Sequence, residues 1–203
     1  MLAALLTSAS RRADAQLPRR SWGIGTVFGG GISYNVVPSL MPPAVAFGAQ
    51  ADLGTLELRF FVTERYSIDV YSQLGNTLLS SISAALPRQP SEPGSLIFAS
   101  LGVLWAFHIP FASGAHSVIV AAGLEVGGDV GVGGLYEMTH PVKFAFRVPM
   151  RVGVELLLRS RAVGFQFLAR PFLEAYGYAR QGGRDIVSPG FGVLAEVGVM
   201  FYR

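Results

Sequence analysis

Large apolar and polar side chains alternate along most of this chain, and residues 144–159 show the pattern most clearly. Every even position there is large and apolar, whereas Arg147, Arg151 and Glu155 stand at odd positions. Successive side chains of a strand point to opposite faces, while a helix would spread both sets around its circumference and would not tolerate Pro149. The pattern therefore predicts one strand over 144–159, far longer than the usual globular strand of about 5 to 6 residues.

The same alternation predicts seven further strands. They cover residues 22–34, 45–61, 66–75, 96–109, 116–130, 163–178 and 191–202. In 45–61 the alternation changes phase near Gly54, which predicts a β-bulge at that glycine. An even number of long amphipathic strands is typical of barrels that cross a membrane.

The predicted links between strands alternate in length. The long links are 35–44, 76–95, 131–143 and 179–190, and the short ones centre on 63–65, 110–114 and 160–162. Prolines, which cannot donate to a ladder, gather in the long links, where we also expect Pro189. Short turns at one rim and long loops at the other are a feature of transmembrane barrels. We therefore predict an all-β fold: an eight-stranded antiparallel up-and-down transmembrane β-barrel.

The cost of exposing charge to lipid decides which face points inward. An Arg on the lipid face at the middle of the bilayer costs about 2 to 4 kcal/mol, so we expect the charged set inside. The expected interior polar network is Glu57, Arg59, Asp69, Glu125, Asp129, Arg147, Arg151, Glu155, Arg170, Glu174 and Glu196, with Asp52 and Arg159 as further members. Eight strands leave an interior just wide enough for side chains, which favours a packed, salt-bridged plug. A narrow ion conduit is the alternative.

Aromatic residues concentrate near the predicted strand ends, as expected for the two interfaces of a membrane. The expected aromatic girdle is Trp22, Tyr34, Tyr66, Trp105, Phe107, Phe144, Phe146, Phe165, Tyr178, Phe191 and Phe201. Alternation placed the strands without regard to where aromatic residues fall along them, so their concentration at the strand ends is separate support for the predicted barrel.

Composition narrows the class of protein. The 203 residues are 51% apolar with few charges, yet the longest apolar stretch is interrupted by polar residues and proline and is too short for a spanning helix. The net charge of +3 comes without a basic run, so nucleic-acid binding is not indicated. The chain has no Cys, which excludes disulfides and thiolate metal sites. Its length fits one domain.

The first residues differ from the rest. We expect residues 1–20 to be a signal peptide or flexible N-terminus and 21–203 to be the barrel domain. Ala13-Asp14-Ala15 before Gln16 has the small-x-small form of a signal-peptidase site, which predicts cleavage after Ala15.

With these features, residues 21–203 resemble the small bacterial outer-membrane β-barrels of the eight-stranded OmpA/OmpX-like class. The resemblance rests on strand number, alternation, loop asymmetry and a final amphipathic strand ending in Phe201-Tyr202. It implies an integral protein of the cell outer membrane, embedded in outer-membrane lipid. It also implies recognition of the C-terminal strand by the barrel-assembly machinery, although Arg203 follows where the class commonly ends on Phe.

Candidate chemistry is sparse. His108, His116 and His140 are dispersed, Ser117 points away from the face of its neighbour His116, and no Gly-x-Ser-x-Gly elbow occurs. We expect no cofactor, no metal and no enzymatic activity. We expect a structural or surface-interaction role through the long loops, where the proline-rich segment 83–94 could bind an extracellular ligand. The alternatives are a porin-like channel, a lipid A-modifying enzyme and a soluble lipocalin-like barrel.

Overall fold

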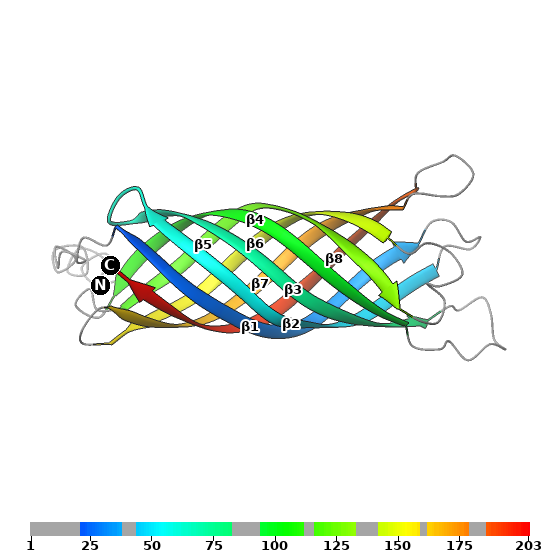
Figure 1. Cartoon of the computed structure of the whole chain (residues 1–203), viewed down its shortest axis with the longest axis horizontal. Coiled ribbons are helices and arrows are strands. Elements are labelled where there is room, and N and C mark those ends of the chain that lie inside the picture. The colour runs from blue at the N-terminus through cyan, green and yellow to red at the C-terminus, as the bar shows by residue number, and fades with distance from the viewer. Residues whose placement is uncertain are drawn as a thin grey trace, which may run out of the picture.

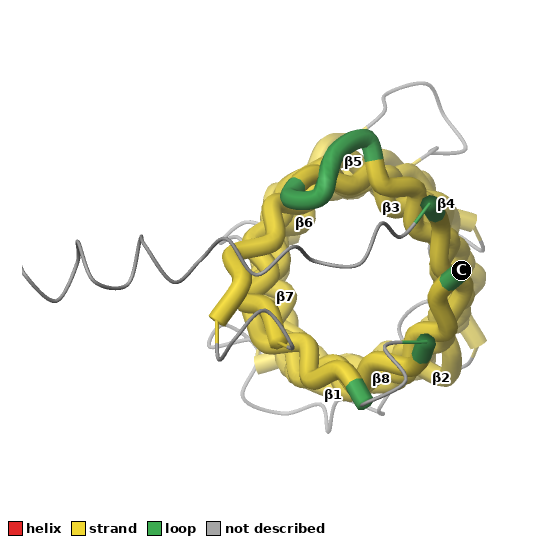
Figure 2. Tube along the Cα trace, turned by 90° about the vertical axis from the view of Figure 1, so that its left-hand side faces the viewer, coloured by secondary structure: helices red, strands yellow, loops and turns green. Residues whose placement is uncertain are grey.

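The chain forms one closed barrel of eight strands, in which each strand pairs antiparallel with the next and β8 pairs with β1. The computed structural model describes residues 21–37, 44–82, 94–111, 116–132, 142–158, 162–178 and 186–203. The strands are β1 (Trp22–Val37), β2 (Ala44–Phe61), β3 (Tyr66–Ile82), β4 (Gly94–Phe111), β5 (His116–Val132), β6 (Val142–Leu157), β7 (Val163–Tyr178) and β8 (Ile186–Tyr202). Figure 1 shows them wound around one long axis, and Figure 2 shows the closed ring from one end.

Backbone hydrogen bonds close the seam between the first and last strands. The Ser21 amide donates to the Arg203 carbonyl at 2.9 Å, and the Arg203 amide donates to the Trp22 carbonyl at 3.0 Å. This end of the barrel also carries the β2–β3 connection (Figure 1). We call it the turn rim, because its links 62–65, 112–115 and 158–162 are the short ones, and we call the opposite end the loop rim.

Eight strands in up-and-down order confirm the predicted fold, but several predicted boundaries are wrong. β3 continues to Ile82 rather than ending near residue 75, and β8 begins at Ile186 rather than 191. The long links are consequently 38–43, 83–93, 133–141 and 179–185, shorter than predicted. At a rise of about 3.4 Å per residue and a tilt of about 40°, strands of this length give a barrel about 44 Å tall. That height exceeds the apolar band of about 25 Å, so strand ends beyond the lipid lose the alternation.

The prediction that Pro189 lies in a long link is also wrong. Pro189 belongs to β8 and lies opposite Ala175 of β7. Pairing of β8 with β1 ends at Gly190 and Asn35, so the missing amide hydrogen of Pro189 removes no ladder bond to β1. Pro110, expected in a turn, likewise lies within β4, opposite Ser117.

The predicted bulge is confirmed. The register of β2 shifts between Asp52 and Gly54 against β3, and the matching shift against β1 lies between Val27 and Gly29. The carboxylate of Asp52 holds the bulge, because Oδ1 accepts from the Gly54 amide at 3.0 Å and Oδ2 accepts from the Thr55 hydroxyl at 2.7 Å. The bulge therefore restores the outward phase of the apolar residues that follow it.

The outer wall is apolar. Many large apolar side chains are exposed on it, among them Ile32, Leu101, Val126, Phe144 and Leu173. The described residues include no helix able to cross a membrane. A closed wall with apolar side chains outside and charges inside is the arrangement that lipid requires, because every strand edge in the wall is paired. The lipocalin-like alternative, which needs the opposite orientation, is therefore excluded.

Most of the expected aromatic girdle lies on this outer wall. Trp22, Tyr66, Trp105, Phe144, Phe146, Phe165, Phe191 and Phe201 are exposed, and Tyr34 and Phe107 are half-buried. Near the turn rim, the Tyr66 and Phe107 rings lie 4.8 Å apart, and toward the loop rim the Tyr34 and Phe191 rings stack at 5.1 Å. The side chain of Tyr178 lies outside the described ones.

Candidate functional site

The barrel interior is the only large gathering of charge in the described part of the chain. Seven carboxylates and four guanidiniums are buried there, an excess of three carboxylates. The members are Asp52, Glu57, Asp69, Glu125, Glu155, Glu174 and Glu196, with Arg59, Arg147, Arg151 and Arg170. Because acids outnumber bases, each Arg must serve several carboxylates. The side chains form two clusters, one toward each rim.

Arg59 is the centre of the cluster nearer the turn rim, which we call the turn-side cluster. Its guanidinium donates to both carboxylate oxygens of Asp69, at 3.0 and 2.9 Å, and to Glu57 at 2.9 Å. It also reaches across the barrel to Glu155 at 3.2 Å and to the Tyr202 hydroxyl at 2.8 Å. Arg59, Glu57, Asp69 and Glu155 are all fully buried. Buried charges are tolerated away from water when hydrogen bonds between the partners replace their hydrogen bonds to water, as they do around Arg59.

Further groups extend the turn-side cluster. Arg151 donates to Glu57 at 2.5 Å, so this carboxylate joins two guanidiniums. The Tyr202 hydroxyl donates to Glu155, which also accepts from the Gln166 amide at 3.1 Å. The terminal strand is thereby fastened to the interior by the side chain of Tyr202.

The second cluster lies nearer the loop rim, and we call it the loop-side cluster. Arg147 donates to Glu174 at 2.8 Å and to Glu125 at 3.1 Å. Arg170 contacts Glu196 at 2.8 Å, but its other carboxylates lie near the limit of an ion pair, with Glu125 at 3.8 Å and Asp52 at 4.0 Å. The 2.8 Å contact is not aligned as a hydrogen bond, and Glu196 accepts none from the described residues. Within the loop-side cluster, Arg147 is therefore held by directed hydrogen bonds, whereas the contact of Arg170 with Glu196 is held by charge.

Two aromatic rings enclose Arg147. The guanidinium carbon lies 4.6 Å from the centre of the Phe98 ring and 4.9 Å from that of Phe172, a cation–π contact on each side. Glycines make room for the rings, since a Cβ at Gly75 would lie 2.2 Å from Phe98 and one at Gly192 would lie 2.3 Å from Phe172. The layer thus brings together side chains of β4, β6 and β7 across the interior.

These rings and other apolar side chains accompany the predicted polar network inside the barrel. Leu104, Ile119, Leu168 and Tyr71 are buried inside and belong to one cluster. Phe98 and Phe172 are interior residues that the sequence did not predict, because the prediction rested on charged positions. Their inward parity within the alternating windows was the available signal. The interior is therefore a mixed apolar and ionic core.

The structure places most residues of the expected network within these two clusters. Asp129 is the exception: its backbone lies opposite Lys143 in the β5–β6 ladder, but its side chain lies outside the described ones. Arg159 also falls outside the described residues, as do residues 1–20 with the expected cleavage after Ala15. Among the described side chains, no group of three or more His, Asp or Glu is arranged to hold a metal ion.

A serine, a histidine and an aspartate meet near the turn rim. The Ser67 hydroxyl donates to Asp69 at 2.7 Å and lies 2.9 Å from Nε2 of His108. All three side chains are buried, and the oxygen of Ser67 is oriented toward the carboxylate rather than toward an open face. Ser117, beside His116, is buried as well, and His140 lies outside the described residues. The Ser67 side chain is thus almost entirely shielded from solvent.

No protein-family model and no curated protein sequence matches the chain. The chain does match solved structures. Outer membrane protein AlkL, determined in lipid bilayers, superposes with a TM-score of 0.55 at 11% identity, over 91% of this chain and 90% of that one. Neisserial surface protein A gives 0.49 at 11% identity, over 90% and 96%. Ail, the attachment invasion locus protein of Yersinia pestis, gives 0.40 at 9% identity, over 88% and 99%. At such low identity the likeness to AlkL shows the fold alone.

The fold and the apolar outer wall both indicate a barrel that lies in a membrane. The likeness shows the architecture of a small outer-membrane barrel, and the apolar exterior with its buried charges shows independently that this wall faces lipid. The chain is an integral β-barrel of the outer-membrane type.

Proposed function

We propose that this integral barrel is a closed, non-enzymatic protein of the outer membrane, whose packed interior supports a structural or surface-interaction role of its long loops. One observation carries the proposal: Arg59 is fully buried and bonded to side chains of β2, β3, β6 and β8, which fills the interior near the turn rim. The layer of Phe98, Arg147 and Phe172 supports it from the loop side. A through channel would have to pass both.

Planar-bilayer conductance tests the closed interior. We expect the purified, refolded barrel to give no reproducible current steps. Arg151→Leu removes one interior guanidinium, and Leu101→Ala changes the lipid face as a matched control. Reproducible steps from the unmodified protein that change with Arg151→Leu and persist with Leu101→Ala would establish the narrow porin-like channel instead.

The role of the loops has its own test. The segment 83–94 lies mostly outside the described residues, and its link joins two long, paired strands. Replacing residues 84–92 with a short Gly-Asn turn should leave folding intact, because loops tolerate such changes. A surface-interaction role predicts that liposomes bearing the full barrel bind labelled cells and that liposomes bearing the shortened barrel do not. Equal binding by both would contradict a role for this loop.

A lipid A-modifying activity is the remaining competitor. The burial of Ser67, His108 and Ser117 argues against it, since a nucleophile must reach its substrate. Mass spectrometry of lipid A from cells with and without the protein should give identical spectra. A mass difference that depends on the protein would replace the structural role with an enzymatic one.

A further inference from the structure

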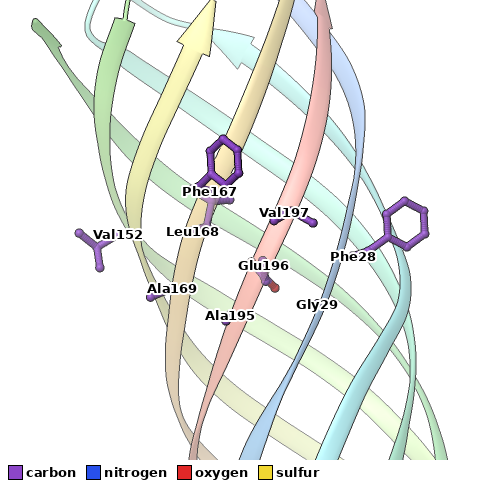
Figure 3. A pocket seen from close by; sticks show the side chains of 9 residues that line it. All are labelled: Phe28, Gly29, Val152, Phe167, Leu168, Ala169, Ala195, Glu196 and Val197. Atoms are coloured by element: carbon purple, nitrogen blue, oxygen red, sulfur yellow. The ribbon is translucent and has the colours of Figure 1, made fainter.

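The outer wall of the barrel carries a groove of about 590 Å³ across β6, β7, β8 and β1. Its rim is formed by large side chains, among them Phe28, Val152, Phe167 and Val197. Figure 3 shows Val152 and Phe28 at opposite sides of the groove, with Ala169 and Ala195 between them. The groove is thus a depression in the surface that faces lipid, bounded on opposite sides by Val152 and the ring of Phe28.

Small residues in direct register cross the wall at the groove, and two of them, Ala169 and Ala195, line its floor. Ala169 of β7 lies opposite Ala195 of β8, Ala195 lies opposite Gly30 of β1, and Gly30 lies opposite Ala51 of β2. Neighbouring strands lie about 4.8 Å apart, so this row extends about 14 Å diagonally across the wall. The side chain at each of these four positions is a methyl group or a hydrogen atom.

The charge nearest to the groove is on the other side of the wall. Glu196 contributes to the lining through its position in β8, but its side chain is buried inside the barrel, where it contacts Arg170 at 2.8 Å. The outward side chains of the groove are apolar. The groove therefore offers shape and dispersion contacts, with no charge to recognise.

We propose that this groove holds one acyl chain of a bilayer lipid as a bound, slowly exchanging ligand. The groove is continuous with the lipid-facing belt and lies between the aromatic residues of the two rims, Phe201 and Phe191 on β8. Its surroundings in the membrane are therefore acyl chains. The hydrophobic effect does not favour burial within a bilayer, but an unfilled depression loses its dispersion contacts outright.

The shape of the groove favours an acyl chain over a second barrel. Two barrels present convex walls to each other, whereas this depression has Val152 and the Phe28 ring at opposite sides of Ala169 and Ala195. A flexible chain can lie over Ala169 and Ala195 between these two side chains. A convex wall would rest on Val152 and Phe28 and leave the space over the two alanines empty.

Native mass spectrometry of the whole barrel tests the proposal. The probe is dimyristoyl phosphatidylcholine: the barrel is refolded into vesicles of this lipid and released into detergent. Ala195→Phe fills the floor from β8, and Val193→Phe is the matched control, because Val193 is the preceding outward position on the same strand and does not line the groove. Ala169→Phe fills the floor independently from β7. Unheated and boiled gel migration establishes that each variant is folded.

We expect the unmodified barrel and Val193→Phe to retain one lipid. Ala195→Phe and Ala169→Phe should lower the retained fraction about tenfold, which corresponds to about 1.4 kcal/mol. Equal retention by folded Ala195→Phe and the unmodified barrel would overturn the proposal. A mass of two chains that Ala195→Phe abolishes would also overturn it, because a second copy would then occupy the groove.

Discussion

Replacing Arg59 with methionine should destabilise the barrel strongly, because Arg59 is the cation that the turn-side cluster shares. Arg59→Met keeps a long flexible side chain but removes the guanidinium that donates to Asp69, Glu57 and Glu155. Glu57 keeps its contact with Arg151 at 2.5 Å, and Glu155 keeps Gln166 and Tyr202. Among the described residues, Asp69 keeps only the Ser67 hydroxyl as a hydrogen-bond donor. A buried carboxylate would thus lose the cation that bonds to it directly.

The expected loss follows from the burial. Arg59 and Asp69 are fully buried, so water cannot replace the two lost hydrogen bonds of 3.0 and 2.9 Å. Breaking a buried ion pair by removing one partner costs about 3 to 5 kcal/mol. A loss of that size in the free energy of unfolding raises the equilibrium constant for unfolding by more than about a hundredfold. Replacing both partners, as in Arg59→Met with Asp69→Leu, should recover part of the loss, because a matched apolar pair is often close to neutral.

Urea unfolding in detergent micelles, followed by tryptophan fluorescence, measures these differences in the free energy of unfolding. Arg65→Met is the control, since Arg65 is exposed in the β2–β3 turn and should change stability by no more than about 0.5 kcal/mol. The reasoning is refuted if Arg59→Met costs less than about 1 kcal/mol, well below the range for a broken buried pair. It is refuted equally if the double variant is less stable than Arg59→Met alone.

Two further predictions concern the wall. Gly123→Ala should prevent the heat-resistant folded band on gels, because the added Cβ would lie 1.8 Å from the Val103 carbonyl oxygen. Gly30→Ala is the control and should fold, because its added Cβ would have its nearest contact at 3.4 Å. Equal folding of both variants would contradict this account. Leu101→Arg places a charge on the lipid face and should lower the free energy of unfolding in vesicles by about 2 to 4 kcal/mol. Val62→Arg, in the exposed turn, should not lower it, and an equal loss would mean that Leu101 does not face lipid.

The alternation of side chains was enough to determine the strands, their order and their faces. In an up-and-down barrel each strand pairs with its neighbours in the sequence, so local information fixes the ladder. The bulge at Gly54 was also readable, because a change of phase within one strand has few other physical causes. The strand ends beyond the lipid were not readable: near Ile82 and Ile186 no apolar solvent selects one face, and the period-two signal disappears.

The contacts across the interior could be decided only by the tertiary structure. Arg59 meets Glu155 and Tyr202, which lie 96 and 143 positions away in the chain. Alternation places all three inside, but strand tilt and stagger decide which inward side chains reach one another. The same holds for Phe98 and Phe172, which meet around Arg147 because the strands curve into a closed cylinder. The alternation in the sequence determines which side of the wall each residue faces, and closure of the barrel determines which interior residues contact one another.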